Sequence, residues 1–142
     1  MSTEEENKAV VHQLMEAFNS RDREAFDACY AEEIVVHGRR GDRTLDHDAH
    51  WAEVQSIFQV FPDRKEKLLG MAAEDDHVFI YWTNTATHLG KSESGIEPTG
   101  KQAEWWGFSD YRFEDGKIVE AWQIHDSLDL YVQLGLVELP QA

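Results

Sequence analysis

The sequence predicts an α+β fold in which helices early in the chain cover one face of a curved antiparallel sheet. Apolar residues recur at helical spacing chiefly before Pro62. After Pro62 the chain is rich in β-branched and aromatic residues, which are typical of strands. Asp115-Gly116 joins two of these runs, and this dipeptide favours a tight hairpin. Strands of about ten residues or more twist and bend, so we expect the sheet to curl into a cone around a cavity.

Three helices are expected before Pro62. The first carries Thr3 and Glu6 at capping-box spacing. Asp22 can cap a short second helix, and the third runs from about Asp48 to Phe61, where Pro62 ends it. The residues that share the inward faces are Val10, Val11, Leu14, Met15 and Phe18, then Ala25, Phe26, Cys29 and Tyr30, then Trp51, Val54, Ile57, Phe58 and Phe61.

The strands follow, with one short strand before the third helix. They are expected over residues 34–37, 65–71, 77–88, 102–113 and 118–124. The loop at residues 38–43 is cationic in an otherwise acidic chain, and residues 90–100 form a polar connection. A closing helical turn over residues 127–134 stops at Gly135.

Net charge limits the classes of partner. The chain has 13 Lys+Arg against 28 Asp+Glu, a formal net charge of −15. Phosphates would be repelled, so we expect no nucleic acid and no membrane as a partner. The acidity fits either a high-salt habitat or an ordinary acidic surface, and both interpretations stay open.

The remaining composition indicates one cytoplasmic domain. A length of 142 residues suits a single core, so residues 1–142 are expected to form one domain. Cys29 is the single cysteine and excludes an internal disulfide. The sequence has no apolar run of about 18 residues, and it opens Met-Ser-Thr-Glu-Glu-Glu without a basic-then-apolar leader.

The C-terminal third carries a family resemblance. The stretch from Tyr111 to Trp122, followed by Asp126 and Gln133-Leu134-Gly135, resembles the SnoaL-like polyketide cyclase family of the NTF2-like superfamily. Further similar segments lie at residues 7–11, 61–63, 87–90 and 95–101, so that the resemblance spans nearly the whole chain in segment order. It implies a cone-shaped α+β barrel, a small hydrophobic ligand and a tendency to form homodimers.

The resemblance also implies a chemistry. Cyclases of this family close a ring by intramolecular aldol condensation without cofactor or metal, using a pocket carboxylate as base. The matching residue is Asp126. A carboxylate among apolar neighbours has a raised pKa and can accept a proton near neutral pH. The alternative is that Asp126 caps the helix that follows it. His125 directly before Asp126 and the polar loop at 90–100 depart from the family pattern.

His37 and His88 are further catalytic candidates. Each ends a predicted strand, at a position that resembles a pocket-facing polar site of the family. Histidine can relay a proton or polarise a carbonyl at physiological pH. The alternative for both is a structural histidine held by a backbone hydrogen bond.

Aromatic residues are expected to bind the substrate by stacking on a flat body. Trp106, Phe108, Asp110 and Arg112 share one face of their strand, and Trp105, Gly107, Ser109, Tyr111 and Phe113 share the other. The alternation leaves open which face is concave; if the first is, Asp110 can pair with Arg112 and steer substrate. The predicted substrate-binding set is Tyr81, Trp82, Trp106, Asp110, Trp122 and Phe58. The alternative for the aromatic members is an ordinary core.

Other motifs are weak or missing. His47 and His50 stand three residues apart at a helix start, but no third ligand is spaced to join them, so no metal is expected. The sequence contains no Gly-rich phosphate loop, Gly-x-Ser-x-Gly elbow or His-Glu-x-x-His motif, and no cofactor is expected.

Three functions remain. The first is a cofactor-free enzyme acting on a small hydrophobic carbonyl compound by aldol or isomerase-like chemistry, with Asp126 as acid or base and His37, His88 or Tyr81 as donor to the enolate oxygen. The second is a non-catalytic protein that holds a ligand in the same cavity, where Asp126 is only a cap. The third is an interaction module whose own aromatic side chains fill the cavity.

Overall fold

A six-stranded sheet with the strand order β2-β1-β6-β5-β4-β3 organises the molecule. The computed structural model describes residues 3–141, so Met1, Ser2 and Ala142 of the predicted domain lie outside the described residues. The helices are α1 (Thr3–Ser20), α2 (Arg23–Asp27), α3 (His47–Val60) and α4 (Ser127–Gln133). The strands are β1 (Tyr30–His37), β2 (Arg43–Asp46), β3 (Lys65–Glu74), β4 (His77–Thr87), β5 (Gln102–Glu114) and β6 (Lys117–His125).

The sheet is mixed rather than purely antiparallel. β1 pairs in parallel with β6, where Val36 lies opposite Ala121, and every other neighbouring pair is antiparallel. After β2 the chain crosses through α3 to the far edge at β3 and then returns strand by strand until β6 meets β1. The α+β class and the curved sheet are confirmed, while the sheet stays unclosed, with β2 and β3 as its two edges.

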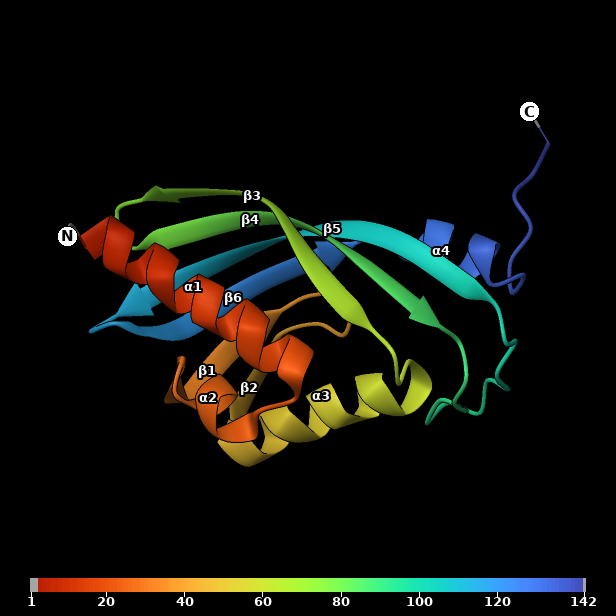
Figure 1. Ribbon diagram of the computed structural model, residues 1–142, viewed down its shortest axis with the longest axis horizontal. Coiled ribbons are helices and arrows are strands. Elements are labelled where there is room, and N and C mark those ends of the chain that lie inside the picture. Colours follow the sequence, from red (N-terminus) through yellow and green to blue (C-terminus); the bar gives the residue numbers. More distant parts are fainter. Residues whose placement is uncertain (1–2, 142) are drawn as a thin grey trace.

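Helices α1, α2 and α3 lie against the concave side of the sheet, and α4 lies apart from them. Figure 1 shows α1 running beneath β3 and β4, with α2 and α3 below the arch of the sheet. α4 lies beside β5, at the opposite end of the molecule from the start of α1. None of the helices within residues 3–141 is long and apolar enough to cross a membrane.

Strict alternation divides the long strands between two faces. On β5 the buried side chains are Ala103, Trp105, Ser109, Tyr111 and Phe113, and on β4 they are Val78, Ile80, Trp82, Asn84 and Ala86. The side chains between them are solvent-exposed, such as Trp106 and Phe108 at 46% and 49%. The Trp105 set therefore forms the concave face, which answers the question that the sequence left open.

The predicted boundaries hold with four differences, of which one is that β3 continues to Glu74 instead of ending at Met71. Asp22 caps α2 as expected, with Ala25 N donating to its Oδ1 at 3.1 Å. β1 begins at Tyr30 instead of Ile34, and β2 is not predicted, since the expected loop ends at Arg43 and no element is expected for the residues after it. α3 begins at His47 because Asp46, not Asp48, caps it, with Ala49 N at 2.8 Å from its Oδ1. The missed strand β2 pairs with β1 from Glu33 to Val36, an edge contact that local patterns do not reveal.

Close packing holds α3 against the connection after β4. Gly90 N donates to Val60 O at 3.1 Å, and a Cβ at Gly90 would lie 1.7 Å from Gln59 O. Because the neighbour is backbone at the end of a helix, it cannot move aside cheaply. α3 carries one wall of the cavity described below, so this contact helps to set the distance between that wall and the sheet.

We predict that Gly90→Ala lowers the free energy of unfolding by about 1–3 kcal/mol. The matched control is Gly70→Ala, because a Cβ at Gly70 meets nothing within 4 Å. Urea denaturation followed by tryptophan fluorescence compares the two variants with the wild type. Equal midpoints for Gly90→Ala and the wild type would contradict the tight approach.

Candidate functional site

A cavity of about 620 Å³ lies between the helices and the concave face of the sheet. The range for small-molecule pockets includes this volume, so the interpretation in which the protein's own rings fill the hollow does not hold. The apolar part of the lining includes Leu14, Phe18, Phe26, Val36, Val54, Ile57, Trp82 and Ile124. The polar part includes Tyr30, Arg39, Arg40, Arg43, His50, Glu53, Arg64, Glu66, Ser109, Tyr111, Gln123, His125 and Ser127.

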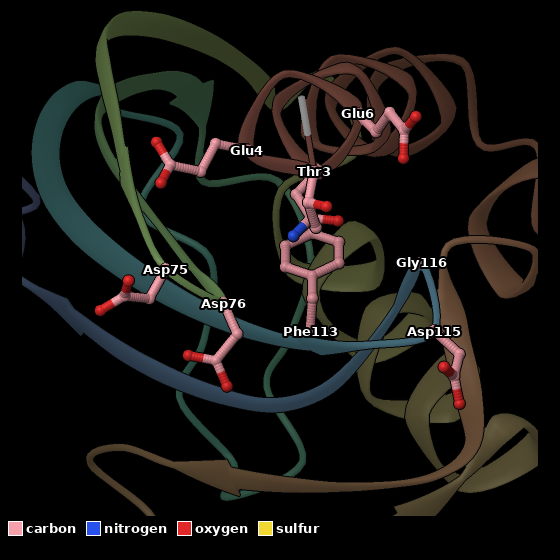
Figure 2. A pocket seen from close by; sticks show the side chains of 9 residues that line it. Thr3, Glu4, Glu6, Asp75, Asp76, Phe113, Asp115 and Gly116 are labelled. Carbon is pink, nitrogen blue, oxygen red and sulfur yellow. The ribbon is translucent and has the colours of Figure 1, made fainter. Parts of the chain in front are cut away.

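A second hollow is an open depression at the start of α1. It is lined by Thr3, Glu4, Glu6, Asn7, Asp75, Asp76, Phe113, Asp115 and Gly116. Figure 2 shows its carboxylates spread around the opening and pointing away from one another. Within residues 3–141, no group of three His, Cys, Asp or Glu side chains is arranged to hold a metal ion. The depression brings no chemical groups together, whereas the concave cavity does.

A three-residue polar bridge lies in the cavity. Arg64 Nε donates to Asn84 Oδ1 at 2.8 Å, and Asn84 Nδ2 donates to Glu66 Oε1 at 3.2 Å. Asn84 is fully buried and lies directly opposite Glu66 in the β3–β4 register. Since the amide oxygen faces a cation and the amide nitrogen faces a carboxylate, the orientation of the amide is determined at both ends. We call Arg64, Asn84 and Glu66 the polar bridge.

The main chain around the polar bridge is clamped from two sides. Asn19, at the end of α1, donates from Nδ2 to Glu66 O and accepts from Glu66 N, each at 2.8 Å. Asp63 accepts hydrogen bonds from both the N and the Oγ1 of Thr87, each at 2.7 Å. The start of β3 is therefore tied to α1 and to the end of β4, which holds the side chains of Arg64 and Glu66 in the cavity.

Burial changes the acid–base properties of the polar bridge. It raises the pKa of Glu66, although the charge of Arg64 and the hydrogen bond from Asn84 act in the opposite direction. It also lowers the pKa of Arg64, whose guanidinium lies 5.3 Å from the Trp105 ring and 5.4 Å from the Phe18 ring. Glu66 is thus a carboxyl group whose proton affinity is higher than usual.

Two tyrosines and two histidines complete the polar lining. Burial, with a contribution from the charge of Glu66, raises the pKa of Tyr30 and of Tyr111, so both hydroxyls keep their protons. Burial lowers the pKa of His50 to about 4. Burial followed by the charges of Arg64 and Arg39 lowers the pKa of His125. At neutral pH the cavity therefore holds phenols and neutral imidazoles that can donate or accept a hydrogen bond.

Asp126, the first of the predicted catalytic residues, caps a helix beside the cavity. Its Oδ1 accepts from Asp129 N at 3.0 Å and so caps α4. Its neighbours His125 and Ser127 line the cavity, but Asp126 itself is not part of the lining. The capping alternative therefore describes its observed contact, and its part in proton transfer stays a prediction.

Neither His37 nor His88 is part of the cavity lining, although Val36 and Gly38 on either side of His37 are. His37 Nδ1 lies 2.7 Å from Asp42 Oδ1 and its Nε2 lies 2.6 Å from Glu120 Oε2. Both carboxylates accept hydrogen bonds from the imidazole, which raises the pKa of His37, the bond to Glu120 having the larger effect. His88 is buried, and its Nδ1 accepts from Thr99 N at 3.1 Å. The structure thus gives both histidines the backbone or side-chain partners of a structural role, and it does not bring them together with Asp126.

Only Trp82 of the predicted substrate-binding residues lines the cavity. The strand alternation directs Tyr81, Trp106, Asp110 and Trp122 to the convex face instead, which corrects their expected position. Asp110 pairs with His77 at 2.7 Å, not with Arg112, which pairs with Glu120 and Glu114. Phe58 packs on Phe18, at 5.0 Å between ring centroids, behind the cavity wall.

The polar bridge escaped prediction because its residues look like surface residues. Arg64, Lys65, Glu66 and Lys67 form a charged run, which is usually solvent-exposed in a strand. The available signal was Asn84, a polar residue at an inward position after Val78, Ile80 and Trp82. A buried amide requires partners, and its register partner is Glu66.

Comparison with known proteins adds family and fold. The family model described as SnoaL-like polyketide cyclase matches residues 8–134. The chain is similar to AclR of Streptomyces galilaeus, provisionally named a hydroxylase, with 28% identity, a TM-score of 0.83 and coverage of 98% of this chain and 91% of that chain. It is similar to IdmH of Streptomyces antibioticus, provisionally named a polyketide cyclase, with 28% identity, a TM-score of 0.80 and coverage of 91% and 98%.

A third similar structure is provisionally named a polyketide cyclase and comes from Acidithiobacillus ferrooxidans. It shows 30% identity and a TM-score of 0.81, with coverage of 97% of this chain and 100% of that chain. No curated protein gives a significant match.

The raised pKa of Glu66 predicts a stability effect with a defined sign. Because the pKa of Glu66 is higher in the folded than in the unfolded chain, the folded state binds more protons between those two values. The stability that Glu66 contributes is therefore present below the unfolded pKa and is lost as the pH rises through the folded pKa. Glu66→Gln cannot ionise, so its free energy of unfolding relative to the wild type should increase by about 1 kcal/mol or more between about pH 4 and pH 8.

Urea denaturation at a series of pH values measures this difference. Glu74→Gln, which removes an exposed carboxyl group from the same strand, is the control and should give a nearly flat difference. A flat difference for Glu66→Gln as well would show that Glu66 is solvated in the folded protein.

Proposed function

The chain belongs to the SnoaL-like polyketide cyclase family, and we propose that it is an enzyme that performs acid–base chemistry on a small hydrophobic carbonyl compound in the concave cavity. The observation that supports this proposal is the polar bridge: a carboxyl group of raised pKa and a cation held side by side within apolar walls. The expected reaction is the aldol ring closure of the family's cyclases, and isomerisation is its nearest relative.

We assign the proton transfer to Glu66. Its carboxylate takes a proton from the carbon next to a carbonyl group, and the C–H electron pair moves into an enolate. The enolate carbon attacks a second carbonyl carbon of the same molecule, which forms the C–C bond, and the resulting alkoxide receives the proton back. A raised pKa suits this task because a general base works best when its pKa is near the operating pH.

Arg64 is the proposed partner of the developing enolate oxygen. Its Nε is committed to Asn84, which leaves the two Nη groups of the guanidinium for an oxyanion. The protonated hydroxyls of Tyr30 and Tyr111 supply further donors in the same lining. A preorganised donor of this kind contributes about 10²–10³-fold to rate in enzymes that stabilise an oxyanion.

A non-catalytic binding protein is the second candidate. The non-catalytic hypothesis assigns Asp126 only the role of capping α4. The hydrogen bond that Asp126 accepts from Asp129 N agrees with that role. The same cavity would then hold a ligand without exchanging its protons. The two candidates differ in whether a bound ketone loses an α-proton to the protein.

We predict that the wild-type protein accelerates α-hydrogen exchange of 2-tetralone, a bicyclic ketone, in D₂O as followed by NMR. Glu66→Gln should lower the catalysed rate by about 100-fold or more, while binding of 2-tetralone by calorimetry stays within a few-fold. Asp126→Asn is the matched control, because Asn caps a helix nearly as well as Asp, and it should retain most of the rate.

The opposite pattern, with loss in Asp126→Asn and not in Glu66→Gln, would assign the proton transfer to Asp126. Binding of 2-tetralone without any acceleration over buffer in the wild type would favour the binding protein.

We further propose that the convex face pairs with a second copy of the chain. Phe79, Tyr81, Trp106, Phe108 and Trp122 are exposed there by 36–49%. At about 200 Å² for each aromatic side chain these fractions amount to several hundred Å², which is at the upper end of what a monomer leaves exposed. Beside this patch Arg112 pairs with both Glu120 and Glu114. A two-fold interface packs like patch on like patch.

Phe108→Glu should convert the dimer to a monomer, because it adds one unpaired charge to each side of the interface. Leu89→Glu is the control, since Leu89 is 55% exposed and lies away from the convex face, in the connection after β4. Sedimentation equilibrium gives the mass of each species. A monomeric wild type, or an unchanged mass for Phe108→Glu, would contradict the proposed interface.

A further inference from the structure

The cavity collects arginines in a strongly acidic protein. Four of the chain's 13 lysines and arginines line it, and all four are arginines: Arg39, Arg40, Arg43 and Arg64. Only two carboxyl groups, those of Glu53 and Glu66, share the lining. The cavity is therefore the place where a chain of net charge −15 concentrates positive charge.

Most of these cavity arginines lack a carboxylate partner. Arg43 is neutralised by Glu53, with Nε at 2.8 Å and Nη2 at 3.0 Å from its oxygens. Within residues 3–141, no carboxylate oxygen forms an ion pair with Arg39, Arg40 or Arg64. Outside the cavity, Arg23 and Arg112 each pair with two carboxylates. Where 28 acidic residues are available, an arginine without a carboxylate partner leaves its donors to another acceptor.

Two of the cavity arginines, Arg39 and Arg40, lie in the loop between β1 and β2 and are called the rim arginines. Gly41 N donates to Gly38 O at 2.9 Å, and Gly41 has φ 83°, so the loop turns sharply there. Arg39 Nη1 donates to Tyr131 Oη at 3.0 Å, which holds Arg39 toward α4. Arg39 and Arg40 are both solvent-exposed while they line the cavity, as groups at an entrance do.

The positive charges of Arg39 at the entrance and of Arg64 in the polar bridge both affect one side chain of the lining, His125. The same lining holds the guanidinium groups of Arg39 and Arg40, the rings of Phe18, Phe26 and Trp82, and the side chains of Arg64 and Glu66. Arg64 is already engaged with Asn84 and is the proposed partner of the reacting oxygen, so the free donors of the rim remain for a separate group.

We propose that the substrate is an anionic aromatic molecule, whose flat apolar body lies in the cavity and whose carboxylate or phosphate is held at the rim by Arg39 and Arg40. This inference rests on the proposed function, since it names the substrate class of the same cavity. The planar fork of arginine matches both carboxylate and phosphate oxygens. The charged group fixes which end of the molecule enters first, and thus which carbon reaches Glu66.

Calorimetric titration with three naphthalene probes tests the proposal without any turnover. 1-Naphthoate and 1-naphthyl phosphate carry the anion, and 1-naphthamide is the neutral match of the first. The wild type should bind at least one anionic probe about tenfold or more tightly than 1-naphthamide, and that preference should fall as salt rises. The double variant Arg39→Gln/Arg40→Gln should lose the preference and keep its affinity for 1-naphthamide.

A control variant and the pattern of binding distinguish a failure of this inference from a failure of the proposed function. The control is the double variant Arg23→Gln/Arg112→Gln, which removes the same two positive charges outside the cavity. This control should retain the preference for the anionic probe. Equal binding of charged and neutral probes by the wild type would overturn the anionic substrate class. An unchanged preference in the double variant Arg39→Gln/Arg40→Gln would overturn the assignment of the anion to Arg39 and Arg40. Either result would leave the proposed acid–base chemistry intact. Binding of none of the probes would contradict the aromatic body and so overturn this inference, while the α-hydrogen exchange of 2-tetralone would still test the proposed function separately. The better-bound anionic probe decides between carboxylate and phosphate.

Discussion

The hydrogen-bonded bridge from Arg64 through Asn84 to Glu66 is the interaction on which the functional cavity depends. A guanidinium and a carboxyl group taken out of water are costly unless each finds partners. Here the buried amide satisfies one atom of each, and the clamp from Asn19 holds the strand that carries Glu66. Removing Arg64, Asn84 or Glu66 would leave a desolvated polar group without its partner. The three polar residues are therefore retained together within the apolar lining of the cavity.

The two faces of the sheet serve different purposes. The concave face of β4 and β5 buries Trp82 and Trp105, while the convex face exposes Tyr81 and Trp106, one residue away on each strand. A single pair of adjacent tryptophans thus contributes one ring to the interior and one to the outside. Strand alternation alone produces this division, because neighbouring side chains of a strand point to opposite faces.

Local patterns predicted the helices, the long strands, the Asp115-Gly116 turn and the α+β class, since each depends on residues close together in sequence. The inward face of β5 could not be predicted, because both parities are aromatic, and its assignment needs the helices packed on one side. The pairing of β1 with β6 depends on the whole chain path, and the inward position of Glu66 depends on register with Asn84. Asp126 shows the limit of resemblance, which marks a residue and does not tell what it touches.

The parallel pairing of β1 with β6 also governs when the hollow can exist. Tyr30 lies opposite Ile118 and His37 opposite Trp122, so strands from the two ends of the chain share one seam. Contacts so distant in sequence form slowly, because the chain loses the entropy of closing a long loop before these contacts contribute any stability. During synthesis on the ribosome, β1 and β2 must wait for β6 to emerge before they join the rest of the sheet. The concave cavity is therefore among the last parts of a nascent chain to be completed.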